Sequence, residues 1–275
     1  MTAQQAEATA RNYYDSEDAD NFYSLVWGGE DIHVGLYQTP DEEIAAASRR
    51  TVTRMTEVAG IGKGTEVLDL GAGYGGAGRQ LARNVGAAVH CLNLSPVENE
   101  RNARLTKEQG LENLVTVATG TFEDVPVADA SVDVVWSQDA FLHSGDREKV
   151  LDEIARVLRP GGHAVFTDPM AGDGVDQTQI QPILDRIQLS TMATPGFYTT
   201  GLEKRGFTSV TFSDHAHQLP THYGRVRQEL VKRESELGGR ISDEYITKMK
   251  AGLQHWVDGG NSGNLTWGIF HAVKG

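Results

Sequence analysis

The chain has 275 residues, 39% of them hydrophobic, which is enough for the core of one large domain. Its formal net charge of -13 argues against nucleic acid or a membrane as a partner, and its single cysteine excludes an intrachain disulfide or a cysteine-based metal cluster. The N-terminal stretch lacks a signal-peptide pattern, and no apolar run approaches about 18 residues. We therefore expect a cytoplasmic protein, monomeric or homodimeric, with a small-molecule ligand.

The N-terminal part differs in composition from the rest of the chain. Residues 4–26 have a helical pattern with many charges and tyrosines, and residues 27–37 are rich in glycine, aromatic and titratable side chains. Such a segment forms a poor core of its own, so we predict that residues 1–40 cover a pocket; an ordinary N-terminal cap is the alternative. A helix is expected over 41–59, opened by acidic residues and closed by glycine.

From residue 66 onward, short apolar runs alternate with helical patterns. This alternation predicts an α/β fold: a mostly parallel seven-stranded sheet with helices on both faces and ligands at the carboxyl ends of the strands. We predict one domain, with a Rossmann-like core at 41–213 and 263–275 and a helical insertion at 214–262. The expected strands are 66–70, 87–93, 114–118, 132–136, 163–167, 208–213 and 265–273, and the later helices are 77–85, 96–109, 146–158, 178–191, 199–205, 222–238 and 242–257.

The first predicted strand runs directly into a glycine-rich turn at 71–76 and then a helix. Backbone without side chains can approach a ligand closely at such a helix N-terminus. The glycine spacing also fits a dinucleotide fingerprint, but two residues argue against a nicotinamide cofactor. Asp69 would repel a pyrophosphate, and Asn93 stands at the end of the second strand, where a ribose-binding acid is expected. Asp69 suits a cationic ligand, or ordering of the turn's own amides.

Three segments resemble the motifs of class I methyltransferases that use S-adenosylmethionine: VLDLGAGYG (67–75), DVVWS (133–137) and LRPGG (158–162). The resemblance implies S-adenosylmethionine as cofactor, S-adenosylhomocysteine as product and no metal. It places the glycine turn against the methionyl and ribose parts, Asn93 at the ribose hydroxyls, and the Thr121-Phe122 pair at the adenine. Asn93 and Thr121 depart from the acids that are commoner there. The implied cofactor-binding residues are Asp69, Gly71, Ala72, Gly73, Gly75, Asn93, Leu94, Thr121, Phe122, Ser137 and Gln138.

Four further segments are similar to the sarcosine/dimethylglycine N-methyltransferases of betaine synthesis: WGGEDIHVGLY (27–37), CLNLSP (91–96), WSQDAFLHS (136–144) and TDPM (167–170). This similarity covers most of the chain. It implies methylation of N,N-dimethylglycine to glycine betaine, with sarcosine as a second substrate, and it places His33 near the methionyl carboxylate. Betaine is a compatible solute, so osmoprotection is the expected role, and an acidic protein suits a salty cytoplasm.

Asp139 and His143 also resemble the Asp-x-x-x-His pair of the phosphoethanolamine methyltransferases. There the matching Asp contacts the substrate amine and the matching His pairs with an N-terminal tyrosine, for which Tyr14 is the best match and Tyr13 the alternative. An aliphatic amine is protonated in water at neutral pH because its pKa is about 10. We therefore predict His143, linked to Tyr14, as the base, and Asp139 as the group that binds the ammonium. A structural histidine is the alternative reading of His143.

The substrate site should hold a quaternary ammonium product, which aromatic faces stabilise by about 0.5–2 kcal/mol each. Trp27 is the first aromatic candidate, followed by Tyr37, Phe141, Phe197 and Tyr198, and core packing is the alternative for all of them. Arg186 is predicted to bind the substrate carboxylate, with a solvated helix charge as the alternative. The predicted substrate-binding residues are Trp27, Tyr37, Asp139, Phe141, Pro169, Met170, Arg186 and Tyr198.

Three other functions compete with this interpretation. One is a methyltransferase for phosphoethanolamine, a sterol or another small molecule. The second is a protein that binds the cofactor without chemistry, against which Asp139 and His143 speak. The third is a nicotinamide dehydrogenase. A metal site is not expected, because the histidines at 215, 217 and 222 have no nearby glutamate to complete a usual triad.

Overall fold

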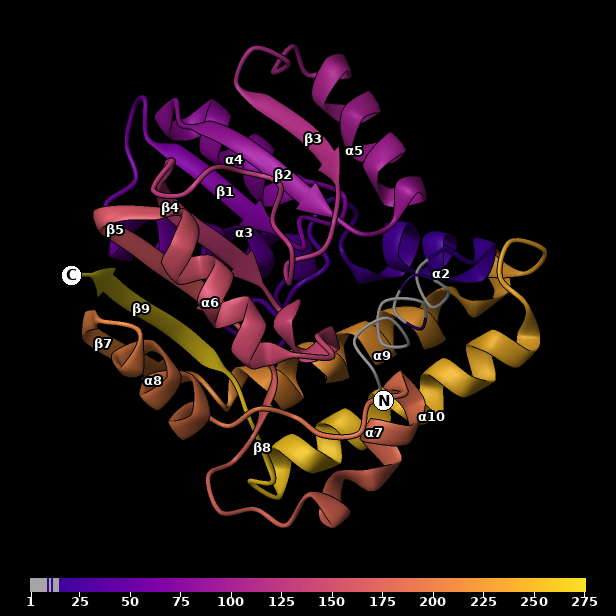
Figure 1. Ribbon diagram of the computed structural model, residues 1–275. Coiled ribbons are helices and arrows are strands. Elements are labelled where there is room, and N and C mark those ends of the chain that lie inside the picture. Colours follow the sequence, from indigo (N-terminus) through magenta and orange to yellow (C-terminus); the bar gives the residue numbers. More distant parts are fainter. Residues whose placement is uncertain (1–8, 10, 12–14) are drawn as a thin grey trace.

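The computed structural model describes residues 9, 11 and 15–275. Its strands are β1 Glu66–Leu70, β2 Ala88–Asn93, β3 Val115–Thr119, β4 Val132–Gln138, β5 Leu158–Thr167, β6 Met170–Ala171, β7 Phe207–Asp214, β8 Leu265–Thr266 and β9 Gly268–Lys274. Within the described residues, seven of them form one sheet in the order β3-β2-β1-β4-β5-β9-β7, and β6 pairs with β8 (Figure 1). β1 to β5 pair in parallel and β9 runs antiparallel to both of its neighbours, so the predicted fold is confirmed.

Helices cover both faces of the large sheet. The α-helices of the described residues are α2 Glu17–Phe22, α3 Ile44–Val58, α4 Gly76–Val85, α5 Pro96–Glu108, α6 Arg147–Val157, α7 Gln181–Ile187, α8 Pro195–Lys204, α9 Gln218–Leu237 and α10 Asp243–Asn261. Met55 of α3 and Leu81 of α4 pack in one core, and Ile154 of α6 and Leu202 of α8 pack in another. These two cores hold the sheet rigidly, so the loops at its carboxyl end have a fixed base.

Two of the predicted helices are interrupted in the structure. The helix expected over 4–26 breaks at Ser16, whose extended backbone and side chain cap α2 by accepting from the Ala19 N–H. The chain then continues as a π-helix over Tyr23–Trp27. The helix expected over 178–191 is a 3-10 turn followed by α7, which ends where Gln188 adopts a left-handed conformation (φ 55°). In both places a local cap overrides the helical pattern of the sequence.

Segments from the two ends of the sequence lie side by side at the carboxyl ends of the strands. α2 and the π-helix contact α9 and α10 there, and together with α7 they enclose a third hydrophobic cluster (Figure 1). The rings of Trp27 and Tyr223 meet at 5.6 Å, edge to face. Asn21 donates to the backbone oxygen of Arg240 at 2.9 Å. The N-terminal cover and the helices between β7 and β9 therefore share one core.

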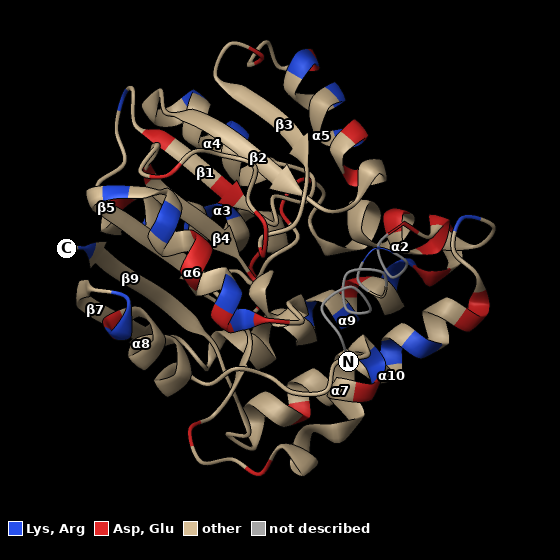
Figure 2. Cartoon of the chain, in the orientation of Figure 1, with Lys and Arg blue, Asp and Glu red and all other residues tan. Residues whose placement is uncertain are grey.

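Charged side chains fasten this cover to the sheet. Figure 2 shows the acidic residues gathered on α2. Among them, Asp20 pairs with Arg101 of α5 at 2.6 Å and accepts from the hydroxyl of Tyr74 at 2.8 Å. The Arg101 guanidinium also lies 4.8 Å from the centre of the Tyr74 ring. Because Tyr74 belongs to the glycine turn after β1, these contacts position the cover over that turn.

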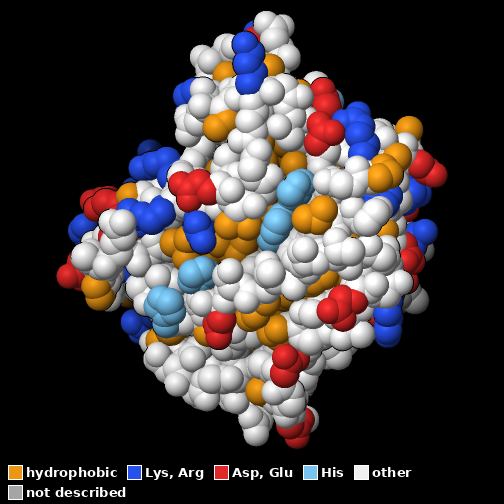
Figure 3. Space-filling model, turned by 90° about the vertical axis from the view of Figure 1, so that its left-hand side faces the viewer, with side chains coloured by type: hydrophobic (Ala, Val, Ile, Leu, Met, Phe, Trp, Pro, Cys, Tyr) orange, Lys and Arg blue, Asp and Glu red, His pale blue; other side chains and the backbone are white. Residues whose placement is uncertain are grey.

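The face at the amino ends of the parallel strands has a mixed character. Acidic, basic and histidine side chains alternate there with apolar ones (Figure 3). None of the helices that the structure describes is long and apolar enough to cross a membrane. In the same described part of the chain, no three His, Cys, Asp or Glu side chains are grouped so that they could hold a metal ion.

Candidate active site

A cavity of about 770 Å³, the first cavity, opens at the carboxyl ends of β1, β2 and β4. Ile32 of the cover closes one side of it, and Ala140 and His143 lie on another. The predicted cofactor-binding residues in its wall are Gly71, Gly73, Asn93, Leu94, Thr121, Phe122 and Gln138.

Gly71 shows why the turn after β1 requires glycine. Its φ is 78°, and a Cβ atom there would lie 2.4 Å from the Cβ of Ala140. Any side chain would therefore clash with the loop after β4 in addition to straining the backbone. The close approach of these two loops narrows the floor of the first cavity.

Another cavity, the smaller third cavity, lies beside the glycine turn and is lined by charged side chains in which single atoms lack hydrogen bonds. Its wall includes Asp31, His33, Asp69 and Ala72. Asp31 Oδ1, His33 Nε2 and Asp69 Oδ2 are buried and have no hydrogen-bond partner among the described residues, although His33 Nε2 lies 3.7 Å from Asp31 Oδ1. Buried polar groups normally have partners. A ligand that carries both an ammonium and a carboxylate would supply them.

The charged groups of this cluster shift one another's pKa values. Burial raises the pKa of Asp69 to about 7, against the opposing charge of His33. Burial by itself would lower the pKa of His33, but the neighbouring carboxylates of Asp31 and Asp139 outweigh it, so that pKa is raised. A cationic ligand group beside Asp69 would keep this carboxylate ionised.

Glu98 is a site residue that the sequence analysis missed. It lines the first cavity, is only 4% exposed, and accepts from Asn93 Nδ2 at 2.9 Å. Burial raises its pKa to about 7, while the Asn93 hydrogen bond opposes that change. The Ser-Pro-Val-Glu spacing at 95–98 was the available signal, because Ser95 caps α5 and a glutamate at the third helical position turns back toward the cap. A carboxyl group of α5 thus lies beside Asn93 at the end of β2.

Glu98→Gln should change how stability depends on pH. The pKa of Glu98 is raised from 4.5 to about 7, so its stabilising contribution is present below pH 4.5 and is lost as pH rises through 7. Urea unfolding without ligand measures this effect. The free energy of unfolding of the variant, relative to that of the wild type, should rise by on the order of 2–3 kcal/mol between about pH 5 and pH 8. Glu108→Gln, in an exposed pair of the same helix, is the control. Parallel stability curves for the wild type and Glu98→Gln would contradict the assignment.

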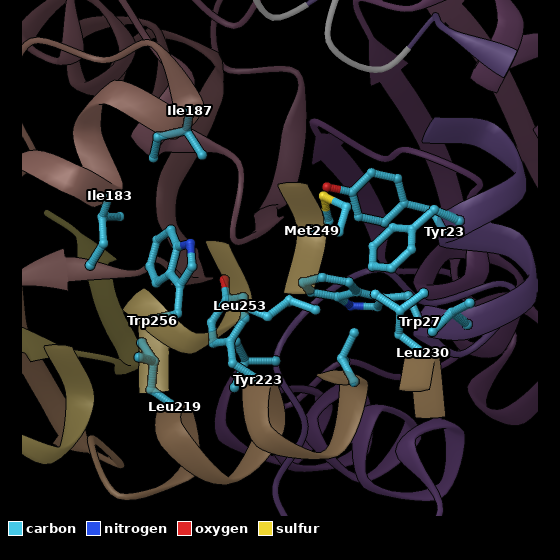
Figure 4. Close-up of a cluster of buried hydrophobic side chains, with 14 of the residues drawn as sticks. Tyr23, Trp27, Ile183, Ile187, Leu219, Tyr223, Leu230, Met249, Leu253 and Trp256 are labelled. Carbon is cyan, nitrogen blue, oxygen red and sulfur yellow. The ribbon is translucent and has the colours of Figure 1, made fainter. Parts of the chain in front are cut away.

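A second cavity lies beside the first and is walled by aromatic rings. Tyr23 and Trp27 come from the π-helix, Tyr223 from α9 and Trp256 from α10 (Figure 4). Pro169 and Arg186 also line it. Of the wall residues, Ile32, Asp139 and His143 face both the first and the second cavity. A group passed from one cavity to the other would have to cross between these three side chains.

Asp139 is held rigidly at this junction. Oδ1 accepts from Thr167 Oγ1 and Trp267 Nε1, each at 2.7 Å, and Oδ2 accepts from the Val34 N–H at 2.6 Å. Its φ of 54° is unusual for a residue with a side chain and marks a constrained site. Burial raises the pKa of Asp139 overall, and the three donors act in the opposite direction. The carboxylate therefore has a fixed position between the cavities.

His143 lies at the end of a 3-10 turn, Phe141–His143, that follows β4. Burial, with a smaller contribution from the charge of Arg147, lowers the pKa of His143 to about 4. The imidazole is therefore neutral near pH 7 and has a nitrogen that can accept a proton. Its predicted partner Tyr14, like Tyr13, lies outside the described residues.

Four predicted substrate residues do not line these three cavities in the structure. Phe141 packs edge to face on Phe122, because successive side chains of a 3-10 turn point in different directions, whereas Leu142 and His143 of the same turn line the second cavity. The other three make structural contacts. Met170 is buried in strand β6 of the two-stranded sheet. Tyr198 donates to Asp168 at 2.7 Å, and Tyr37 Oη lies 3.0 Å from His222 Nδ1.

Two predicted cofactor residues are also structural. Ser137 donates to the backbone oxygen of Leu70 at 2.7 Å and so joins β4 to β1. Gly75 precedes α4 and packs against Asn102, where a Cβ would lie 2.0 Å from the amide oxygen. Neither lines the three cavities. The Ser137 hydroxyl and the close approach allowed at Gly75 serve the strand and helix packing beneath the site.

Comparison with known proteins gives the family. A model described as a methyltransferase domain matches residues 68–166. The chain is 59% identical to the sarcosine/dimethylglycine N-methyltransferase of Halorhodospira halochloris over 272 residues, which cover 98% of each protein. The chain belongs to the sarcosine/dimethylglycine N-methyltransferases. The recognition from sequence motifs is thus confirmed.

Other members of the sarcosine/dimethylglycine N-methyltransferases are similarly close. The chain is 53% identical to the dimethylglycine N-methyltransferase of Parasynechococcus marenigrum (strain WH8102), covering 98% of this chain and 96% of the relative. A solved Galdieria sulphuraria structure assigned to the sarcosine dimethylglycine methyltransferases matches with a TM-score of 0.90 and 46% identity over 95% of this chain and 98% of the other. The chain is therefore an S-adenosylmethionine-dependent N-methyltransferase. The buried atoms of Asp31, His33 and Asp69 that lack hydrogen bonds fit the charged amino-acid end of that cofactor.

Proposed function

We propose that this protein methylates the amine of N,N-dimethylglycine to give glycine betaine for osmoprotection, and that sarcosine is a second substrate. The near full-length identity to enzymes named for these amines supports the proposal. The observation that carries it is the second cavity, which combines four aromatic side chains with the guanidinium of Arg186. Ring faces suit the methylated ammonium, and a guanidinium suits the carboxylate of the same small molecule.

We propose that the first and third cavities hold S-adenosylmethionine, without a metal. When bound, this cofactor supplies a methyl group activated by a sulfonium. Asp69, His33 and Asp31 would hold its charged amino-acid end, and Asn93 with Glu98 would bind the ribose hydroxyls. Thr121 and Phe122, which also line the first cavity, would lie against the adenine.

Residues of this chain must also prepare the amine. The amine nitrogen needs a free electron pair to form its bond to carbon, so the substrate ammonium must first lose its proton. We propose that His143 receives this proton, with Tyr14 as its partner, while Asp139 attracts the ammonium and balances the positive charge of the product. The apolar rings around the second cavity exclude water and lower the pKa of the bound ammonium, which makes the transfer to His143 less costly.

We further propose that residues 1–40 and 214–262 act as one cover over a core of 41–213 and 263–275. In this arrangement the cover supplies Tyr23, Trp27, Tyr223 and Trp256, while the core supplies Asp139 and His143. Binding of both substrates would then require the two parts to stay together. Opening of the cover would expose the second cavity.

Product analysis tests the proposed function directly. The purified protein should convert dimethylglycine to betaine, and sarcosine to dimethylglycine and betaine, when each is supplied with S-adenosylmethionine and followed by mass spectrometry. Phosphoethanolamine, supplied in the same way, should give no product, because Arg186 is the only Lys or Arg side chain that the structure places in the wall of the second cavity. Methylated phosphoethanolamine with no betaine would favour the alternative methyltransferase. Cofactor binding with no product from any amine would favour a non-catalytic protein.

A further inference from the structure

Helix α10 presents Met249, Gly252 and Trp256 on one side, because residues three and seven positions apart share a helix face. This side faces Arg186 of α7. Arg186 Nη2 donates to the Sδ atom of Met249 at 3.2 Å. A Cβ atom on Gly252 would lie 2.2 Å from both Cδ and Nε of Arg186 and 2.9 Å from Cζ. The Arg186 side chain therefore crosses α10 in a slot that exists only because residue 252 has no side chain.

Trp256 contributes a second donor to the same cavity. Its side chain is 2% exposed and lines the second cavity together with Arg186. Nε1 is buried and has no hydrogen-bond partner among the described residues. Figure 4 shows the indole nitrogen directed toward the space that Ile187, Tyr223 and Tyr23 surround. A buried N–H without a partner is unfavourable, so an acceptor on a bound ligand is expected opposite it.

We propose that the Trp256 indole N–H binds the substrate carboxylate together with Arg186, and that Gly252 positions Arg186 for this purpose. The inference rests on the proposed function. A carboxylate has two oxygens that accept several donors, so a guanidinium and an N–H from neighbouring helices can hold it in one orientation. The amine end of the same small molecule then points toward Asp139 and His143 at the junction of the cavities. This wall of α10 selects amines that carry a carboxylate.

The substitution Trp256→Phe tests the contribution of the N–H donor apart from that of the aromatic ring. The variant keeps an aromatic face for the ammonium but loses the N–H. The KM for dimethylglycine should rise at least about tenfold, the effect of losing one hydrogen bond to a charged group. The KM for S-adenosylmethionine should change less than about twofold. Tetramethylammonium, which has the ammonium but no carboxylate, should inhibit the variant and the wild type equally. A loss of tetramethylammonium inhibition with an unchanged KM would assign Trp256 to the cation instead and overturn the proposal.

Gly252→Ala tests the position of Arg186 without altering any donor. The three atoms nearest to the added methyl group all belong to the flexible side chain of Arg186, so we expect the helix to keep its fold while the guanidinium moves. The KM for dimethylglycine should again rise at least about tenfold. Gly224→Ala in α9 is the matched control, because its Cβ would meet Val257 at an ordinary 3.9 Å. Equal melting temperatures of the two alanine variants, with a raised KM only in Gly252→Ala, support the positioning role.

Calorimetry distinguishes failure of this inference from failure of the proposed function. Dimethylglycine is titrated into the wild type and both variants, each saturated with S-adenosylhomocysteine. Tight binding to the wild type with weaker binding to Trp256→Phe and Gly252→Ala supports the carboxylate site even where no betaine is formed. Equal affinity in all three overturns it, even where the wild type forms betaine. Absence of dimethylglycine binding to the wild type overturns both.

Discussion

His143→Ala should lower kcat for dimethylglycine by about two to four orders of magnitude, the usual contribution of a positioned proton-transfer group. His143 lies at the junction of the first and second cavities, and burial lowers its pKa to about 4, so the imidazole is neutral near pH 7. The transfer therefore requires that the apolar cavity also lowers the pKa of the bound ammonium. Cofactor affinity should change little, because other residues form most of the first cavity. Steady-state kinetics and calorimetry with S-adenosylhomocysteine measure the two effects separately.

His163→Ala provides the matched control for this substitution. His163 lies in β5 near the amino ends of the strands, where its Nδ1 atom is 2.8 Å from Nε2 of His271. Its loss should leave kcat within about twofold. Equal turnover of His143→Ala and the wild type would exclude His143 as the base. A fall in cofactor affinity as large as the fall in kcat would show that its role is to support the first cavity.

Asp139→Asn should lower kcat by about 100- to 1,000-fold, the range found when one preorganised charge-stabilising group is removed. The substitution removes the negative charge that faces the ammonium. In the wild type, Trp267 Nε1 donates to one oxygen of Asp139 and the Val34 N–H donates to the other. The NH2 group of asparagine would therefore face a donor in either orientation. Neither of these groups can accept a hydrogen bond. Melting temperature should therefore fall with turnover, by the equivalent of about 1–3 kcal/mol.

Asp168→Asn is the control for Asp139, since it is also a buried carboxyl group, with a pKa raised to about 7 by burial. One oxygen accepts from the Leu142 N–H and the other from the Tyr198 hydroxyl. The hydroxyl can reverse its role and accept from the new amide, so this variant should keep its stability and most of its turnover. The predictions fail if the two variants lose the same activity, because the loss would then reflect burial in general.

The sheet and its order of elements could be predicted because each strand and helix has a local pattern. β1, β2 and β4 coincide with predicted runs to within about two residues, as expected for strongly patterned elements. The turn after β1 was equally predictable, since only glycine fits beside Ala140. Elements with weak patterns were placed less well. Caps at Ser16 and Gln188 ended or divided helices that periodicity alone extends.

The cofactor side of the site followed largely from position in the chain. Parallel strands bring their carboxyl ends to one edge, so Asn93, Thr121 and Gln138 had to meet near Gly71. The spacing of Ser95 and Glu98 indicates a helix cap, but the sequence could not show that the Glu98 carboxyl group meets Asn93 at the end of β2. Nor could it separate Phe141 from His143, because the direction of each side chain in a short turn is decided by the core that it meets.

The sequence by itself determined the sheet, the glycine turn and the residues that end each strand, because local periodicity and chain order suffice for those. Only the tertiary structure decided the substrate pocket. Tyr223, Gly252 and Trp256 lie on helices α9 and α10, far along the chain from Asp139, and no local pattern shows which face of such a helix meets the cover. That face is chosen by packing against the π-helix and α7, where burial of apolar surface outweighs any local preference.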